Sequence, residues 1–424
     1  MTLETLETTD TTDTTGTTQM IRHSSALRSC ESSVSAAPLR FIVLALTLLT
    51  TALPVAQLSA APAIIPRAPD IAATSYILID AKTGQVLIEE NADEPLPPAS
   101  LTKIMTSYIA IEEIINGHLT LDTPVHISEK AWRMEGSKTF VGVDTMVRAE
   151  DLLRGIIIQS GNDASVAIAE HIAGSEEAFA DMMNQYAEVM GMQQSFFMNS
   201  SGLDTELYYN TMSARDLSII ARETVVEHKD FYPMYAEREF TYNGITQSNR
   251  NSLLFRDRNV DGLKTGWTDA AGYCLVASAE RDGMRLISVV MGTESTEARA
   301  IETQKLFTYG FRYFETHQVY SEGQVLANVP VWSGKESDLD LGVTEDVFVT
   351  IPRGQGENLT AALDVEEAVT APLENGQLMG VVNVTLDSDL IYRGDVIAMQ
   401  AVEQGSLFKR FMDWLTLFFS NLFS

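Results

Sequence analysis

The chain has 424 residues, and its 58 acidic against 29 basic side chains give a net charge of −29 at pH 7. A hydrophobic content of 45% with 21% charged residues is ordinary for a globular protein, which excludes wholesale disorder. The acidic surplus argues against nucleic acid as a partner, because a phosphate backbone is held mainly by clustered lysine and arginine. Two cysteines, Cys30 and Cys274, supply neither a disulfide framework nor a zinc knuckle.

Residues 1–60 are predicted to be a disordered start followed by a secretory signal peptide. Residues 1–19 are mostly Thr, Asp and Glu, so we interpret them as disordered or as a mis-assigned start, with Met20 as the initiator. Three arginines, the apolar run Phe41–Leu49 and small residues before Ala60 then follow in the order of an export signal. The run is too short to span a bilayer, so we expect cleavage near Ala60 rather than an anchor.

Residues 61–318 are predicted to form an α/β domain. The pattern from residue 75 gives strand, turn and strand as SYILID, AKTG and QVLIEE. Helices are expected from 100 to about 116 and over 149–190, with breaks at 160–162 and at 174. The runs CLVASAE and MRLISVVMG then flank an Asp-Gly hairpin signal, and residues 296–314 return to helix. Strands at both ends with helices between them predict one antiparallel sheet beside a helical cluster.

The remaining chain is predicted to contain two further parts. Short alternating runs such as DVFVTIP and GVVNVTLD indicate a small all-β domain over 319–405, with no candidate chemistry. Residues 406–424 form an amphipathic helix, because the aromatic residues of LFKRFMDWLTLFFSNLF recur at i, i+3, i+4 spacing. Seventeen residues with three charges are too few to span a membrane, so we expect the helix to anchor peripherally in the interface. The alternative is a terminal helix docked on the protein's own core.

Several kinds of chemistry are excluded by what the sequence lacks. The six histidines show no metal-ligand spacing, so neither a metal nor a cofactor is predicted. No Gly-x-Ser-x-Gly elbow is present, which counts against an α/β-hydrolase.

Three short motifs occur in order and in consistent predicted contexts. Ser100 and Lys103 lie one helical turn apart at a helix start, so the lysine amine reaches the serine hydroxyl. Ser160 and Asn162 lie in the break between helices. Lys264-Thr265-Gly266 is expected to enter a strand.

The residue types of these motifs suit acyl transfer. Lys103 acts as a base only if burial or a neighbouring cation lowers its pKa, and Lys264 is a candidate for that cation. Ser160 is placed to relay protons and Asn162 to hold a substrate amide. Lys264 and Thr265 suit a carboxylate, and their strand suits pairing with an extended peptide. The N–H groups at the helix start suit an oxyanion.

Two other matches to these motifs are interpreted as structural. A second Lys-Thr-Gly, at 82–84, falls in the predicted hairpin turn, where Thr-Gly is ordinary turn chemistry. A second Ser-x-x-Lys, at 406–409, falls in the amphipathic tail.

The three main motifs together resemble those of the low-molecular-mass penicillin-binding proteins that act as serine-type D-alanyl-D-alanine carboxypeptidases. The resemblance covers nearly all of the chain after residue 60, including PASLTKIMT, the SGNDAS segment, NVDGLKTGWTDAAGY and RLISVVMGT. It implies that Ser100 is the acylated nucleophile, Lys103 its base and Ser160 a catalytic partner. Substrate binding would fall to Asn162, to Lys264, Thr265 and Gly266, and to Trp267 and Arg250.

The resemblance also assigns finer roles. An oxyanion hole would be formed by the backbone N–H groups of Ser100 and Trp267. Arg250 matches a family arginine near the substrate carboxylate, although a surface ion pair explains it equally well. This chain departs from the family pattern at two positions that usually hold histidine, namely Trp267 after Lys-Thr-Gly and Ser201 before Gly-Leu-Asp.

The function that the resemblance implies is removal of the terminal D-alanine from peptidoglycan stem pentapeptides through an acyl-enzyme, with β-lactams as inhibitors. The enzyme would work at the periplasmic face of the bacterial inner membrane. Three alternatives stay open: a β-lactamase, a peptidoglycan DD-endopeptidase, and a non-catalytic penicillin-binding scaffold of the cell wall. The sequence assigns no oligomeric state.

Overall fold

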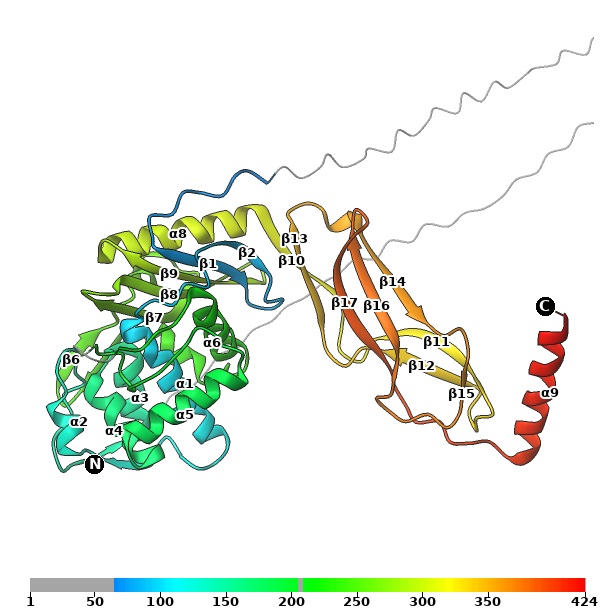
Figure 1. The fold of residues 1–424 in the computed structure, drawn as a ribbon, viewed down its shortest axis with the longest axis horizontal. Helices are drawn as coiled ribbons and strands as arrows, with labels where there is room; N and C mark the ends of the chain where they lie inside the picture. Colours follow the sequence, from blue (N-terminus) through cyan, green and yellow to red (C-terminus); the bar gives the residue numbers. More distant parts are fainter. Residues whose placement is uncertain (1–64, 205–208, 424) are drawn as a thin grey trace, which may run out of the picture. The chain divides into compact units, whose positions relative to one another are not determined.

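The computed structural model describes residues 65–204 and 209–423 (Figure 1). The predicted signal segment, residues 1–60, lies outside the described residues. The helices are α1 (Lys103–Ile115), α2 (Glu129–Arg133), α3 (Ala149–Ile158), α4 (Asn162–Ala173), α5 (Glu176–Val189), α6 (Ala214–Val226), α7 (Leu253–Arg256), α8 (Thr296–Tyr313) and α9 (Leu407–Phe423), with 3-10 turns η1 (Ala99–Thr102), η2 (Tyr232–Ala236) and η3 (Gly356–Asn358). The strands are β1 (Ser75–Asp80), β2 (Val86–Glu90), β3 (Pro124–His126), β4 (Met146–Arg148), β5 (Glu239–Tyr242), β6 (Ile245–Ser248), β7 (Val260–Thr268), β8 (Gly272–Arg281), β9 (Met284–Thr293), β10 (Phe314–Tyr320), β11 (Val325–Trp332), β12 (Asp338–Gly342), β13 (Val347–Pro352), β14 (Leu359–Val365), β15 (Val369–Thr370), β16 (Leu378–Leu386) and β17 (Asp389–Ala398).

A five-stranded antiparallel sheet, in the order β2-β1-β9-β8-β7, forms the centre of the first part of the chain. Its first strand pairs with β9, more than 200 residues later, so that Tyr76 lies opposite Val290. Asp282 and Gly283 both have positive φ, 51° and 80°, as the two-residue β8–β9 hairpin requires. The predicted α/β fold with one antiparallel sheet is therefore confirmed.

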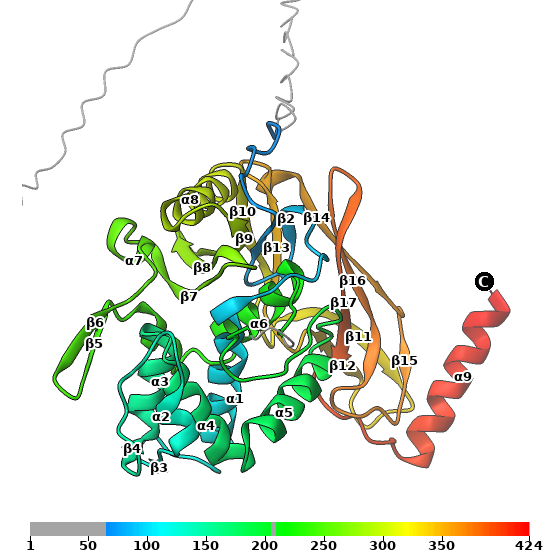
Figure 2. The ribbon, with the colours of Figure 1, turned by 60° about the vertical axis from the view of Figure 1, so that its left-hand side comes forward.

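The two faces of this sheet are covered by different helices, because successive strand side chains point to opposite sides. Tyr76 and Leu78 of β1 pack in one cluster with Phe307 of α8. Ile77 and Ile79 pack in another cluster that includes residues of α1, α5 and α6. Figures 1 and 2 show α8 on one side of the sheet and the helical cluster on the other.

The predicted helix breaks are present, and the first of them places Ser160 in the lining of a cleft. Helix α3 ends at Ile158 and α4 begins at Asn162, while Gly174 ends α4 with φ 82°. The predicted helix at Ser100 begins with the turn η1 before α1 starts at Lys103. Lys264 was predicted to enter a strand, but β7 begins at Val260, so the motif lies in the middle of an edge strand. The residues before the motif also belong to this strand, since Val260 and Gly262 pair with Ala279 and Ser278 of β8.

The second part of the chain, before α9, is rich in β-strands, as predicted, but its first strand, β10, begins at Phe314 and not at residue 319. A two-stranded sheet pairs β10 with β13, and a six-stranded sheet has the order β14-β16-β17-β12-β11-β15. Its core contains fully buried aliphatic side chains such as Leu339, Leu341 and Val382. In the described part of the chain, no helix is both long and apolar enough to cross a membrane.

Candidate active site

Ser100 and Lys103 meet because a 3-10 turn leads directly into a helix. The last turn of η1 and the first residue of α1 place the Lys103 Nζ 3.2 Å from the Ser100 Oγ. Lys103 is fully buried, whereas Ser100 is only half-buried and lines a cleft. The serine hydroxyl is thus accessible from the cleft while the amine that contacts it is not.

The Lys103 amine has three polar partners, and both a charged and a neutral amine can satisfy them. Its Nζ lies 2.8 Å from the Asn162 Oδ1 and 2.5 Å from the Ser201 carbonyl oxygen, both of which can only accept. The third partner, the Ser100 hydroxyl, can accept or donate. A neutral amine donates two hydrogen bonds and accepts one. In that form it donates to both carbonyls and can accept the Ser100 proton, whereas a charged amine would donate to all three partners.

The electrostatic surroundings of Lys103 favour this neutral form. Burial is the largest cause, and the positive charge of Arg250 adds to it, so the pKa of Lys103 is lowered to about 7. The nearby carboxylates of Asp163 and Glu176 oppose the shift without cancelling it. The sequence suggested Lys264 as the cation that lowers this pKa. In the structure the positive charge of Arg250 lowers the pKa of Lys103. Burial, with the charge of Lys103, lowers the pKa of Lys264 well below its ordinary value.

The Ser201 carbonyl is held beside Lys103 by an unusually close backbone approach. A Cβ on Gly202 would lie 1.8 Å from the Ala99 carbonyl oxygen, so only glycine fits there. Gly202 also has φ 72°, which other residues rarely adopt. The side chain of Ser201 turns toward its own loop, where its Oγ accepts from the Leu203 N–H at 3.2 Å. Position 201 thus contributes through its backbone, which no side-chain motif could reveal.

Ser160 reaches the cleft through strained backbone geometry. It lies between α3 and α4 with φ 60°, a left-handed conformation that is uncommon for a residue with a Cβ. Among the described residues its buried Oγ has no hydrogen-bond partner, and Ser160 lines the same cleft as Ser100. An unpaired buried hydroxyl at this position is available to a bound substrate.

Asn162 is oriented toward the base. Its Oδ1 accepts from Lys103, and its Nδ2 donates to the Glu135 carbonyl at 2.6 Å. Because both ends of the side-chain amide contact the protein, Asn162 fixes the amine of Lys103. The predicted contact of Asn162 with a substrate amide stays a prediction.

The Lys-Thr-Gly motif forms the opposite wall of the cleft. Lys264 is buried, and its Nζ donates to the Thr265 carbonyl at 3.1 Å. Gly266 lies close to η1, because a Cβ there would come within 2.7 Å of the Pro98 carbonyl oxygen. The sequence reasoning missed Arg299 of α8, whose Nη1 donates to the Gly266 carbonyl at 3.1 Å. A lone arginine on a helix belongs to no motif, so only the fold reveals it.

The cleft has two adjoining compartments of different size and charge. The smaller one, about 230 Å³, is lined by Ser100, Ser137, Ser160, Arg250, Thr265, Gly266, Trp267, Tyr273, Thr296 and Arg299. The larger one, about 650 Å³, shares Ser100 and Trp267 with the first and adds Asn162, Asp204 and Asp269. Arg250 lines both and donates from Nε to the Gln159 carbonyl at 3.2 Å. No ion pair to Arg250 is present among the described residues, which disfavours the surface-pair interpretation.

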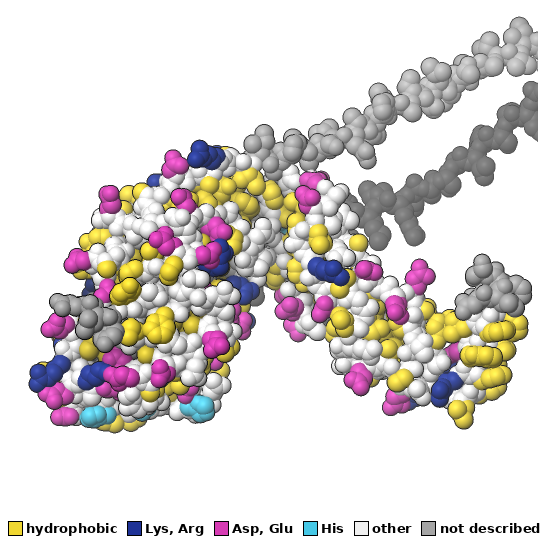
Figure 3. Space-filling model, viewed as in Figure 1, with side chains coloured by type: hydrophobic (Ala, Val, Ile, Leu, Met, Phe, Trp, Pro, Cys, Tyr) yellow, Lys and Arg dark blue, Asp and Glu magenta, His cyan; other side chains and the backbone are white. Residues whose placement is uncertain are grey.

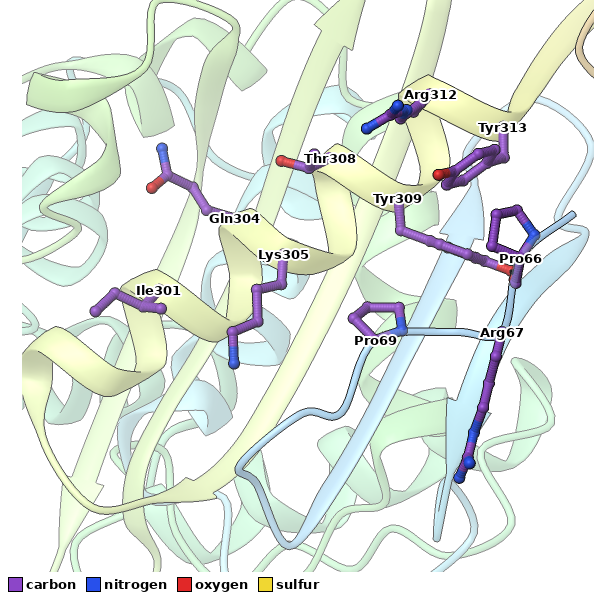
Figure 4. A pocket seen from close by; sticks show the side chains of 10 residues that line it. All are labelled: Pro66, Arg67, Pro69, Ile301, Gln304, Lys305, Thr308, Tyr309, Arg312 and Tyr313. Carbon is purple, nitrogen blue, oxygen red and sulfur yellow. Dashed lines mark hydrogen bonds between the residues drawn. The ribbon is translucent and has the colours of Figure 1, made fainter.

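One other hollow and the two other motif matches, all within the described residues, contain no serine in contact with a buried lysine. A hollow of about 570 Å³ lies between α8 and residues 66–69, and Figure 4 shows its Lys305 and Arg312 side chains along the helix. Its Lys305 amine is already paired with Glu302 at 2.8 Å. The second Lys-Thr-Gly lies in the β1–β2 turn, and Lys409 of the second Ser-x-x-Lys donates to the Gly334 carbonyl at 2.7 Å.

Fold and site together describe a domain with a cleft serine in contact with a buried lysine, an arrangement typical of active-site-serine enzymes. The family model of the D-alanyl-D-alanine carboxypeptidases, Peptidase_S11, matches residues 63–295, and that of the penicillin-binding protein 5 C-terminal domain matches residues 314–404. The chain belongs to this carboxypeptidase family. The family, fold class and serine-carboxypeptidase function predicted from the sequence are thereby confirmed.

The chain is similar to several known proteins over most of its length. It is 42% identical over 391 residues to the D-alanyl-D-alanine carboxypeptidase DacA of Escherichia coli K12, covering 88% of this chain and 96% of that protein. Penicillin-binding protein 5 from Haemophilus influenzae is 39% identical with a TM-score of 0.75, over 80% of this chain and 100% of that one. Ampicillin-bound penicillin-binding protein D2 from Listeria monocytogenes is 29% identical with a TM-score of 0.54, over 58% of this chain and 100% of that one.

The lowered pKa of Lys103 predicts a specific pH dependence for acylation. Only the neutral amine accepts the Ser100 proton, so the second-order rate constant for acylation by benzylpenicillin should rise about tenfold per pH unit below pH 7 and level off above it. Stopped-flow measurement from about pH 5 to pH 9 checks this. Lys103→Met should be slower by at least about a hundredfold. A pH-independent rate over this range would contradict the assignment of the base.

Proposed function

We propose that the protein is exported and removes the terminal D-alanine from peptidoglycan stem pentapeptides, with Ser100 as nucleophile and Lys103 as its base. The observation that carries the proposal is the set of three partners around the Lys103 amine. The Lys103 Nζ lies 3.2 Å from the Ser100 Oγ, and a neutral amine that donates its two N–H groups to the Asn162 and Ser201 oxygens would have its lone pair free for the Ser100 proton. In the proposed reaction the Ser100 Oγ attacks the penultimate D-Ala carbonyl, D-Ala leaves with a proton, and water then hydrolyses the ester.

The other residues of the site would bind the oxyanion, transfer a proton or bind the substrate carboxylate. The backbone N–H groups of Ser100 and Trp267 would hold the oxyanion of the tetrahedral intermediate. The unpaired Oγ of Ser160 would pass a proton to the departing amine. The smaller compartment has Arg250 and Arg299 in its lining and no acidic side chain, so it suits the carboxylate of the terminal residue. Thr265 lines the same compartment and would hydrogen-bond this carboxylate, beside the buried Lys264.

The two departures from the family pattern are compatible with this mechanism. Both positions would act through the backbone, which does not depend on the side chain. Trp267 would supply its N–H group, and Ser201 supplies its carbonyl oxygen to Lys103. A β-lactam presents a strained amide in place of the D-Ala-D-Ala bond, so it would acylate the same serine. The ampicillin-bound structure of the Listeria protein supports this expectation.

A direct test compares the two Ser-x-x-Lys serines. Ser100→Ala should abolish D-Ala release from a stem pentapeptide, because the nucleophile is lost, whereas Ser406→Ala should leave the rate unchanged. The measurement is D-Ala release by the purified chain with and without ampicillin, which should block the wild type. Continued release by Ser100→Ala would overturn the proposal. Ampicillin labelling of Ser100 without any D-Ala release would favour the penicillin-binding scaffold instead.

The C-terminal helix α9 supports peripheral attachment to the membrane surface. Its polar side bonds to the β-rich domain, since Lys409 donates to the Gly334 carbonyl and Asp413 accepts from the Ser333 N–H at 2.8 Å. Its large apolar residues are instead exposed, as Figure 3 shows. They include Leu407, Phe408, Phe411, Trp414 and Phe418, each exposed by more than half. This arrangement disfavours docking of the aromatic face on the protein's own core. We infer that this face enters the membrane interface on the periplasmic side.

Removal of residues 406–424 should therefore detach the enzyme from membranes without impairing catalysis. The chain from residue 61 should sediment with vesicles of phosphatidylethanolamine and phosphatidylglycerol, and the truncated chain should stay in the supernatant. Phe411→Asp, which places a charge on the apolar face, should weaken binding in the same direction, while Asn358→Asp adds the same charge elsewhere as a control. Equal sedimentation of the full and truncated chains would contradict the anchor.

A further inference from the structure

Trp267 and Tyr273 form an aromatic pair at the edge of the smaller compartment, here named the aromatic wall. The two residues lie opposite each other on β7 and β8, and their ring centroids are 5.7 Å apart. Trp267 is 51% exposed, although the motif residues just before it are buried. A large exposed indole beside a reactive serine has no part in the fold's core. Its position points to the substrate.

The aromatic wall is held in place from behind. The guanidinium of Arg299 lies 5.8 Å from the Tyr273 ring centroid, within cation–π range. Arg299 is itself fixed, since its Nη1 donates to the Gly266 carbonyl at 3.1 Å and lies 3.4 Å from the Cys274 carbonyl oxygen. These contacts join α8, β7 and β8 around the ring. Tyr273 is thus held by α8, and Trp267, on the strand β7, packs against it.

The charges of the two compartments decide which part of the substrate meets the wall. Arg250 lines both compartments, but the smaller one adds Arg299 and has no acidic side chain, whereas the larger one adds Asp204 and Asp269. The residue that leaves carries the terminal carboxylate, so it belongs in the smaller, cationic compartment. The larger compartment, about 650 Å³ against about 230 Å³, is left for the acyl part of the peptide.

We propose that the aromatic wall selects for a small leaving group, so that the enzyme releases a single D-alanine and rejects bulkier C-terminal residues and cross-linked peptides. The inference rests on the proposed carboxypeptidase function and adds the basis of its selectivity. In a cross-link, the amine released on acylation of Ser100 belongs to a second peptide. That peptide would extend beyond the smaller compartment, of about 230 Å³, whose lining includes Trp267 and Tyr273. Trp267 thus acts as a specificity-determining residue, through its side chain, in addition to any role of its N–H.

The test is a ratio of rates, which a general loss of activity does not change. The purified chain is assayed on diacetyl-Lys-D-Ala-D-Ala, on its D-Ala-D-Leu analogue and on a cross-linked muropeptide dimer. The wild type should prefer the D-Ala substrate by about a hundredfold in kcat/KM, as a tight pocket allows. Trp267→Ala should reduce that preference at least about tenfold and should cleave the dimer faster than the wild type does.

Variants of graded size and a matched control complete the experiment. Trp267→Phe and Trp267→His should fall between the wild type and Trp267→Ala, which keeps the inference testable if Trp267→Ala does not fold. Trp132→Ala removes another exposed tryptophan, 43% exposed in α2, and should leave the preference unchanged. An unchanged preference in all Trp267 variants would overturn the inference while leaving the proposed function intact. If the wild type releases no D-Ala, the proposed function fails, and the inference fails with it.

Discussion

Burial of a single amine, that of Lys103, is the constraint on which the site depends. A lysine taken out of water is costly when charged, so it either finds a carboxylate or gives up its proton. Here the contacting groups are two carbonyl oxygens and a hydroxyl, with no carboxylate among them. Burial therefore favours the neutral amine beside Ser100, the form that the proposed mechanism requires.

Each partner of this amine comes from a different segment, so the whole domain takes part in building the site. The 3-10 turn before α1 supplies Ser100, the break before α4 supplies Asn162, and the loop before α6 supplies the Ser201 carbonyl. The edge strand β7 closes the cleft and is joined to α8 through Arg299. Helix α1 packs against α4, and η1 packs against β7, which is why the three motifs meet despite their separation in sequence. The chain has only 29 basic against 58 acidic residues, yet Lys103, Lys264, Arg250 and Arg299 all lie in or beside the cleft.

Much of this was predictable, because the decisive features are local. Helical spacing predicts the Ser100–Lys103 contact, the break before Asn162 follows from Ser-Gly-Asn, and the Asp-Gly pair predicts the β8–β9 hairpin. Other features lie beyond sequence patterns. The Ser201 carbonyl is a backbone group, Arg299 has no motif, and the extension of β7 to Val260 depends on pairing with β8 rather than on local propensity. The sequence suggested Lys264 as the cation near Lys103 and did not reveal Arg250, because spacing says nothing about which charges approach in space.

The most direct test of this account is the pKa of Lys103 itself. The chain has nine lysines, so ¹³Cε-labelled lysine gives a simple NMR spectrum in which the Lys103 signal is the one missing from Lys103→Met. A titration of the uninhibited enzyme should give a midpoint of about 7 for this signal. A midpoint near the ordinary lysine value of about 10.4 would show that the amine is charged at neutral pH and would contradict its role as the base.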